Sequence, residues 1–371
     1  MNKDLMLISI VISLVLILQT GCGGGGGGGD DTDPGNSSGS RVNGDITGHL
    51  FIGASGDGEL LDLSTGRYTS IPGVDWSETI ENDYHPSANY YALPSRDGEE
   101  FIETVTSCLR AGDDALSPFN DCIVIHDSDG SIVSSGKMIE DISPTTRFSF
   151  NKNYFAFFYN DGRDSSANDE LVIFDRNFQF ISRSELPGKL ARSFDWLLNG
   201  QIVYIHDQTI YITAPYDTAG TPIYTFSENE GYPDYIAASP DGSEVAFTLV
   251  TYASPYVVNG ATWVMNTDGT DLHQLANIPG NDDPIFNFPT WSPDGQYIIN
   301  VVGYVRPEPP DASNNEPNPG ILGGLYAIPS ASRNVALNDD GDDGVVHIRS
   351  YFSSDQLNYN FSTNGNLVWI P

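Results

Sequence analysis

The sequence predicts an all-β fold, a six-bladed β-propeller, because one short unit of strand, tight turn and strand recurs along the chain. The unit is clearest in AASPDGSEVAF (237–247) and TWSPDGQYIIN (290–300). Asp-Gly and Asn-Gly adopt the positive φ angles that a tight hairpin turn requires. No long stretch shows the 3.6-residue period of an amphipathic helix. A repeated hairpin without helices indicates an array of small sheets.

Alignment gives six copies of this unit, with turns at Ala88, Lys152, Gly200, Gly242, Gly295 and Gly365. A second pair of strands follows each of the first five copies, starting near Cys122, Glu170, Gln208, Ala261 and Gly323. The partner strands of the last copy are expected within His49–Gly73, and Leu367–Ile370 should pair with a strand from residues 48–63. A blade shared by both ends closes the ring. An open solenoid, the alternative, would have a capping repeat at each end instead of a divided repeat.

Residues 1–21 are expected to be a lipoprotein signal peptide. Lys3 precedes an apolar run of 14 residues, Leu5 to Leu18, which is too short to span a bilayer as a helix. The following QTGC resembles the lipobox of bacterial lipoproteins and makes Cys22 the expected lipid anchor, although Gln19 stands where the family prefers Leu. By the same resemblance, Gly23 favours the outer membrane. An ordinary cleavable signal is the alternative.

Two further segments follow, a Gly-rich disordered tether (22–44) and the propeller (45–371). Seven glycines and small polar residues cannot bury apolar surface, so the tether is expected to be flexible. The chain carries 16 Lys and Arg against 50 Asp and Glu, a net charge of −34. This charge repels nucleic acid and excludes it as a partner. The acidity suits a soluble body in a salty medium; attraction of cations or basic partners is the alternative.

WSPDGQYII and GTDLHQLANIPG resemble the TolB-type propeller repeat, in which an aromatic-Ser-Pro-Asp-Gly turn precedes an apolar strand and an Asp-Gly-Thr turn. The resemblance covers roughly residues 45–371 and is strongest in the fourth and fifth copies. TolB has an additional α/β domain where this chain has the tether, so the resemblance concerns the propeller. It implies a binding scaffold of the periplasm or outer membrane.

Catalytic signatures are missing, so no catalytic residue, metal ligand or cofactor is predicted. The sequence has no G-x-S-x-G, H-E-x-x-H or P-loop motif. Its six histidines lie in different blades or strands, and the acidic segment 338–344 does not match a calcium loop. A propeller enzyme acting on an extracellular polysaccharide, with a metal in the channel, remains the second hypothesis. A purely structural envelope protein is the third.

The long connections are expected to gather on one face. The links between the second and third strands are long in blades one (about 95–121), two, four and five, whereas the turns of the opposite face are short. Insertions on one face of a rigid scaffold build recognition surfaces. We therefore expect a non-catalytic monomer that binds a protein, peptide or glycan there. Neutral drift in tolerant loops is the alternative.

Cys108 and Cys122 are the cysteines of the predicted propeller and are expected to form a disulfide in an exported protein. The alternative is a pair of free thiols. The bridge would close a loop of ~15 residues and contribute about 3 kcal/mol in the chain-entropy model.

Two aligned columns define the predicted channel. One column is aromatic in five of six blades and should pack between sheets: Tyr84, Phe148, Trp196, Ala238, Trp291 and Phe361. The preceding column takes the other face of each first strand, toward the channel: Asp83, Arg147, Asp195, Ala237, Thr290 and Asn360. We predict a network in which Arg147 bridges Asp83 and Asp195, since a guanidinium group suits two carboxylates. Such a network would fix the blade register; a ligand site is the alternative.

Overall fold

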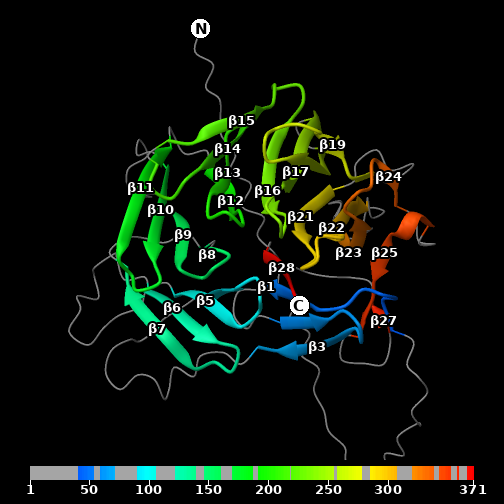
Figure 1. Cartoon of the computed structure of the whole chain (residues 1–371). Helices are drawn as coiled ribbons and strands as arrows, with labels where there is room; N and C mark the ends of the chain where they lie inside the picture. Colours follow the sequence, from blue (N-terminus) through cyan, green and yellow to red (C-terminus); the bar gives the residue numbers. More distant parts are fainter. Residues whose placement is uncertain are drawn as a thin grey trace, which may run out of the picture. The chain divides into compact units, whose positions relative to one another are not determined.

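Six β-sheet blades surround a common centre in the unit Ser40–Pro371 (Figure 1). The computed structural model describes residues 41–53, 59–71, 90–105, 122–138, 146–159, 169–186, 191–217, 219–254, 257–277, 285–306, 320–337, 342–351, 357–358 and 366–371. Within these ranges the one helical element is a 3-10 turn, η1 (Asp342–Gly344). No helix of the described part is long and apolar enough to cross a membrane.

Blades one to three are four-stranded antiparallel sheets whose strands follow chain order from the centre outward. Blade one consists of β4 (Tyr90–Pro94), β5 (Glu100–Val105), β6 (Cys122–Asp127) and β7 (Ile132–Lys137). Blade two consists of β8 (Arg147–Phe148), β9 (Tyr154–Tyr159), β10 (Asp169–Asp175) and β11 (Phe180–Leu186). Blade three consists of β12 (Ala191–Trp196), β13 (Ile202–His206), β14 (Thr209–Thr213) and β15 (Thr221–Thr225).

Blades four and five are joined into one sheet. Blade four consists of β16 (Tyr232–Ala238), β17 (Glu244–Ser254), β18 (Val257–Asn266) and β19 (His273–Gln274). Blade five consists of β21 (Ile285–Trp291), β22 (Tyr297–Arg306), β23 (Gly320–Pro329) and β25 (Val346–Ile348). A parallel bridge between Gly260 and Ile285 connects β18 to β21.

The outer strand of blade five corrects the sequence prediction. The segment after Gly323 was expected to supply both outer strands, but β24 (Val335–Ala336) pairs in parallel with β20 (Ala276–Asn277) beside blade four. The amide of Asn334 donates to Gln274 O at 2.7 Å, which holds this segment against the neighbouring blade. The edge of β23 is therefore free to pair with β25.

Blade six is closed by strands from distant parts of the chain, as predicted. β28 (Asn366–Ile370) pairs antiparallel with β1 (His49–Gly53). The sheet continues through β2 (Glu59–Asp62) and β3 (Arg67–Ser70) to the short β26 (Ser350–Tyr351) and β27 (Leu357–Asn358). The predicted first strand of this blade, at Asn360 and Phe361, lies outside the described residues.

The first turn of blade one lies ten residues after the predicted position, at Gly98 rather than Ala88. Ser95 N donates to Glu100 O at 2.7 Å and Gly98 N to Ser95 O at 2.9 Å. The turn of blade four makes the same two bonds through Ser239 and Gly242. The defining pattern is thus Ser-x-Asp-Gly, because the Ser hydroxyl and Asp carboxylate stabilise the turn, whereas the prediction had matched Pro and Ala.

The aromatic column packs between the sheets as expected. Phe148, Trp196 and Trp291 are buried. The indole of Trp196 donates to Arg147 O, and that of Trp291 to Ala237 O, each at 3.1 Å. Each tryptophan thus ties its blade to the first strand of the preceding blade. The corrected alignment places Pro94, not Tyr84, in this column; Tyr84 is not among the described residues.

Candidate functional site

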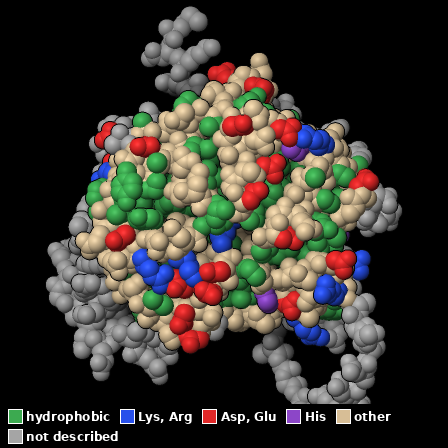
Figure 2. Space-filling model, viewed as in Figure 1, with side chains coloured by type: hydrophobic (Ala, Val, Ile, Leu, Met, Phe, Trp, Pro, Cys, Tyr) green, Lys and Arg blue, Asp and Glu red, His purple; other side chains and the backbone are tan. Residues whose placement is uncertain are grey.

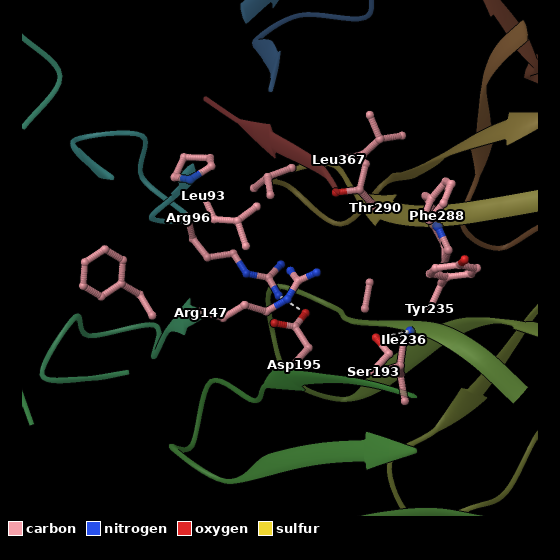
Figure 3. A pocket seen from close by; sticks show the side chains of 15 residues that line it. Leu93, Arg96, Arg147, Ser193, Asp195, Tyr235, Ile236, Phe288, Thr290 and Leu367 are labelled. Atoms are coloured by element: carbon pink, nitrogen blue, oxygen red, sulfur yellow. Dashed lines mark hydrogen bonds and ion pairs between the residues drawn. The ribbon is translucent and has the colours of Figure 1, made fainter. Parts of the chain in front are cut away.

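A small cavity lies at the centre of the ring, where the first strands converge (Figure 3). The column that precedes the aromatic positions faces it, through Leu93, Arg147, Asp195, Ala237 and Thr290. About 50 Å³ is open to the centres of water-sized molecules. This space holds a few waters or a small ion. Asp83 was expected in this column, but the corrected turn places Leu93 there, and Asp83 lies outside the described residues.

Asp195 is held by groups from three blades. Arg96, in the first turn of blade one, forms an ion pair with Asp195 Oδ2. The amide of Ala238 donates to the same oxygen at 2.9 Å, and the amide of Trp196 donates to Oδ1 at 2.9 Å. Arg96 also donates to Ala238 O at 3.2 Å. This carboxylate therefore fixes blades one, three and four relative to one another.

Arg147 approaches the same carboxylate without pairing with it. Figure 3 shows its guanidinium group beside that of Arg96 at Asp195. Burial lowers the pKa of Arg147; Asp195 opposes this effect and Arg96 adds to it. An arginine keeps its charge even so, because the pKa of a guanidinium group lies far above neutral pH. The predicted trio is not tested as a whole, since its third member, Asp83, is not described.

Sequence reasoning missed Arg96, although a signal was present. In the Ser-x-Asp-Gly turns of blades four and five, the second position holds Pro240 and Pro293. Blade one has Arg96 there, and its guanidinium carbon lies 4.6 Å from the ring centroid of Phe150, the equivalent residue of blade two. A long basic side chain at a turn position beside the channel can reach across it.

Two strained aromatic residues form another wall of the cavity. Tyr235 and Phe288 have φ angles of 48° and 54°, which bulky side chains rarely adopt. Each lies at a register shift in a first strand, three residues before the aromatic column. Their ring centroids are 4.1 Å apart with an interplanar angle of 61°. Strain of this kind often accompanies a functional site.

The histidines that the structure describes do not meet at the cavity. None of His49, His126, His206, His273 and His347 lines it. In the described part of the chain, no group of three His, Cys, Asp or Glu is arranged to hold a metal ion. His85 lies outside that part. The convergence of histidines that the polysaccharide-enzyme hypothesis requires is therefore not found among the described residues.

Blade one contains a separate buried acid. Glu103 Oε2 lies 3.8 Å from His126 Nε2, and both side chains are less than a tenth exposed. Burial raises the pKa of Glu103 to about 7. Burial lowers the pKa of His126, which stacks on Phe101 at 5.4 Å between ring centroids. Burial thus favours the uncharged form of each group.

The face opposite the Ser-x-Asp-Gly turns carries two extended hairpins. β13, β17 and β22 start at equivalent positions, two residues after the turn glycine, but have 5, 11 and 10 residues. The extra residues of β17 and β22 add roughly 16 Å of strand. Pairing continues to Ser254–Val257 in blade four and to Arg306–Gly320 in blade five.

The other predicted connections have mixed outcomes. The link of blade three is tight, as expected, between His206 and Thr209. The blade-one link starts after Val105 and not near Ser95, because residues 95–105 form the first turn and β5. The long links of blades one and two fall outside the described residues.

The predicted cysteine sites are largely outside the described residues. Cys22 and Cys108 are not described, so the lipid anchor and the Cys108–Cys122 disulfide stay predictions. Cys122 itself is buried at the start of β6.

Known structures share this architecture. TolB from Acinetobacter baumannii is 14% identical, with a TM-score of 0.51, over 88% of this chain and 68% of that one. This chain has a TolB-like β-propeller fold. A putative TolB from Agrobacterium tumefaciens (14% identity, TM-score 0.47) is covered over 100% of its length and 83% of this chain. A Mycobacterium tuberculosis puromycin-hydrolyzing peptidase (13% identity, TM-score 0.43) is covered over 46% of its length and 79% of this chain. No protein-family model and no curated protein sequence matches the chain. At these identities the TolB-like likeness establishes the fold.

Proposed function

We propose that this protein is a non-catalytic binding scaffold of the cell envelope, anchored by a lipid on Cys22. It engages a protein, peptide or glycan partner through the face that carries the long β17–β18 and β22–β23 hairpins. The observation that carries the proposal is that two extended hairpins lie on adjacent blades, which one backbone bridge joins into a single sheet.

The extended hairpins form a preorganised surface. Both continue their ladders to the last described strand residues, so their backbones are ordered by cross-strand hydrogen bonds. The bridge between Gly260 and Ile285 fixes the base of one hairpin against the first strand of the next blade. A partner bound there would meet ordered strands, which reduces the entropy lost on binding.

The geometry of the centre favours binding over catalysis. The charged groups of the described residues at the cavity are Arg96, Arg147 and Asp195, and Asp195 already accepts hydrogen bonds on both oxygens. No nucleophile beside a general base lines the cavity in the described part of the chain. The TolB-like fold supports an envelope scaffold by resemblance, and the lipobox-like QTGC supports the anchor.

Shortened hairpins test the binding face. In blade four, residues 252–258 are replaced by Asn-Gly, joining the cross-strand pair Thr251 and Asn259. In blade five, residues 305–321 are replaced in the same way, joining Tyr304 and Leu322. The wild type, crosslinked in its own envelope, should capture a partner that both variants lose while keeping their melting temperatures.

A control on the opposite face makes this test specific. Leu198 is 54% exposed in the first turn of blade three, and Leu198→Ser should leave capture unchanged. Capture that survives both hairpin replacements would refute this binding face.

The anchor is tested separately: Cys22→Ser should move the protein to the soluble fraction, and a variant that stays membrane-bound at high salt would place the anchor elsewhere.

A further inference from the structure

The central cavity has an excess positive charge in a strongly acidic protein. Two guanidinium groups, of Arg96 and Arg147, meet the single carboxylate of Asp195 there. Among the described lining residues the formal charges sum to +1, while the whole chain carries −34. Figure 2 shows acidic side chains spread over the face viewed and basic atoms at its centre. A local reversal of charge inside a narrow cavity attracts a small anion.

Arg147 has no ion-pair or hydrogen-bond partner for its guanidinium group among the described residues. Asp195 Oδ2 is occupied by Arg96 and by the amide of Ala238, and Oδ1 by the amide of Trp196. Among the described residues, no carboxylate lies within ion-pair distance of the Arg147 guanidinium group. No hydrogen-bond acceptor of these residues accepts a hydrogen bond from it. Arg147 is only partly exposed, and native structures often compensate a charge with limited access to water by a counter-charge.

The backbone of Arg147 is fixed before any ligand arrives. Its residue pairs with Ala156 in the β8–β9 ladder, and its carbonyl oxygen accepts the indole N–H of Trp196 at 3.1 Å. Arg96 is held from the other side by Asp195, Ala238 O and the ring of Phe150. The fold thus holds the Arg147 backbone and the Arg96 guanidinium group, and the two guanidinium groups lie side by side at Asp195 (Figure 3).

The cavity also selects the kind of anion. A net charge of +1 is neutralised by a monovalent anion, and the guanidinium fork matches a carboxylate with two parallel hydrogen bonds. Apolar side chains of Leu93, Ile236 and Leu367 face the same space and suit a short alkyl group. The available volume excludes a long chain. We propose that the central cavity binds a short monocarboxylate, of the size of formate or acetate, at the Arg147 guanidinium. This site is independent of the partner-binding face proposed above.

Ligand titration of the full-length chain tests the site. Sodium acetate and sodium formate are titrated at constant ionic strength against sodium chloride and sodium phosphate, with calorimetry and thermal unfolding as readouts. Acetate or formate should bind saturably and raise the melting temperature. Phosphate and chloride should bind at least ten-fold more weakly. Tighter binding of phosphate or chloride would overturn the assignment to a monocarboxylate. Absence of saturable binding by acetate and formate would overturn the site.

Substitutions locate the binding. Arg147→Gln should weaken acetate binding at least ten-fold, and Arg333→Gln, at an exposed arginine that pairs with Asp271, should not change it. If Arg147→Gln does not fold, Arg147→Lys keeps the charge but loses the fork, and should still weaken binding several-fold. Undiminished binding in a folded Arg147 variant would place the anion elsewhere and overturn the proposal.

Discussion

Blade six and the fused blades four and five are closed in different ways. In blades four and five, four-residue turns connect the first two strands and hold them together, as the bonds around Ser239 and Ser292 show. In blade six, β1 and β28 pair although His49 and Ile370 are far apart in the sequence. The indole of Trp369 strengthens this junction by donating to Thr47 O at 3.0 Å.

This difference teaches where the ring is vulnerable. A hairpin turn keeps its two strands at high effective concentration, so one lost contact is easily restored. The pairing of β1 with β28 must close a loop of more than 300 residues, which costs conformational entropy. This cost is offset only when the other blades are folded and packed. We expect cooperative unfolding to depend on blade six more than on any turn of blades four and five.

Removal of the N-terminal strands should have the largest effect. Deletion of residues 45–73 removes β1, β2 and β3, leaves β28 without its partner and exposes the rest of their core cluster, such as Ile299 and Trp369. The truncated protein should lose cooperative unfolding in thermal and denaturant melts. An unchanged melting transition would disprove closure by these strands.

Alanine substitutions at two glycines before β1 should separate the effect of a steric clash from that of backbone strain. Gly48 has a φ of +92°, and a Cβ there would lie 2.6 Å from Ile370 O and 2.9 Å from Trp369 Nε1. Gly44 has a φ of +62°, with no atom within 4 Å of such a Cβ. Denaturant melts should show a loss of about 3 kcal/mol for Gly48→Ala and about 1 kcal/mol for Gly44→Ala. Equal losses of stability would show that the junction of β1 and β28 can move to accommodate the added Cβ.

Blade one, next to the junction, should respond to pH through Glu103. Its pKa is about 7 in the folded protein against an ordinary value of 4.5, so the folded state binds the additional proton between these values. Stability is therefore lost as pH rises from about 4.5 through 7. Glu103→Gln should match the wild type near pH 4.5 and be more stable at pH 8, by up to about 3 kcal/mol. A difference that does not change with pH would refute the raised pKa.

Blades four and five contain a buried hydrogen-bonded pair without a titratable group, which contrasts with Glu103. Thr262 Oγ1 donates to Asn300 Oδ1 at 2.5 Å, and both residues are buried. Thr262→Val should cost about 1–3 kcal/mol at every pH, because it leaves a buried acceptor unpaired and titrates no group. A pH-dependent loss would contradict this reading of the pair.

The turn of blade four should give the smallest effect. Asp241 accepts hydrogen bonds from the Ser239 hydroxyl at 2.7 Å and from the Ser243 amide at 2.9 Å. Asp241→Ala should reduce the free energy of unfolding by about 1 kcal/mol without loss of cooperativity. A loss as large as that of Gly48→Ala would show that the turns, too, control closure.

The sequence predicted most of the ring because its signals are local. Ser-Pro-Asp-Gly turns and alternating apolar strands specify hairpins directly, and the lack of partner strands for Leu367–Ile370 predicted the junction with β1. The turn of blade one was placed wrongly because Arg96 replaces the proline of the pattern. The displacement of β24 depends on backbone bonds to another blade, which no local pattern records.

The centre was predicted less completely, for a physical reason. The alternation of a strand correctly placed Arg147 and Asp195 at the channel. The ion pair to Asp195 comes instead from Arg96, a turn residue of a blade not adjacent to blade three. Such a contact depends on the curvature of the whole ring and on the length of one side chain. The strained conformations of Tyr235 and Phe288 are likewise set by bulges that only the three-dimensional register reveals.

The antiparallel pairing of β1 with β28 also determines how the ring would respond to mechanical load. His49 opposes Ile370, and Gly53 opposes Asn366, so the chain enters and leaves the ladder at the same end. A pull between the segment before β1 and Pro371 would load the inter-strand hydrogen bonds one after another and unzip the blade at low force. A pull between that segment and the hairpin of blade four would instead be shared by several packed sheets. A single-molecule experiment would find the ring weak along one direction and resistant along the other.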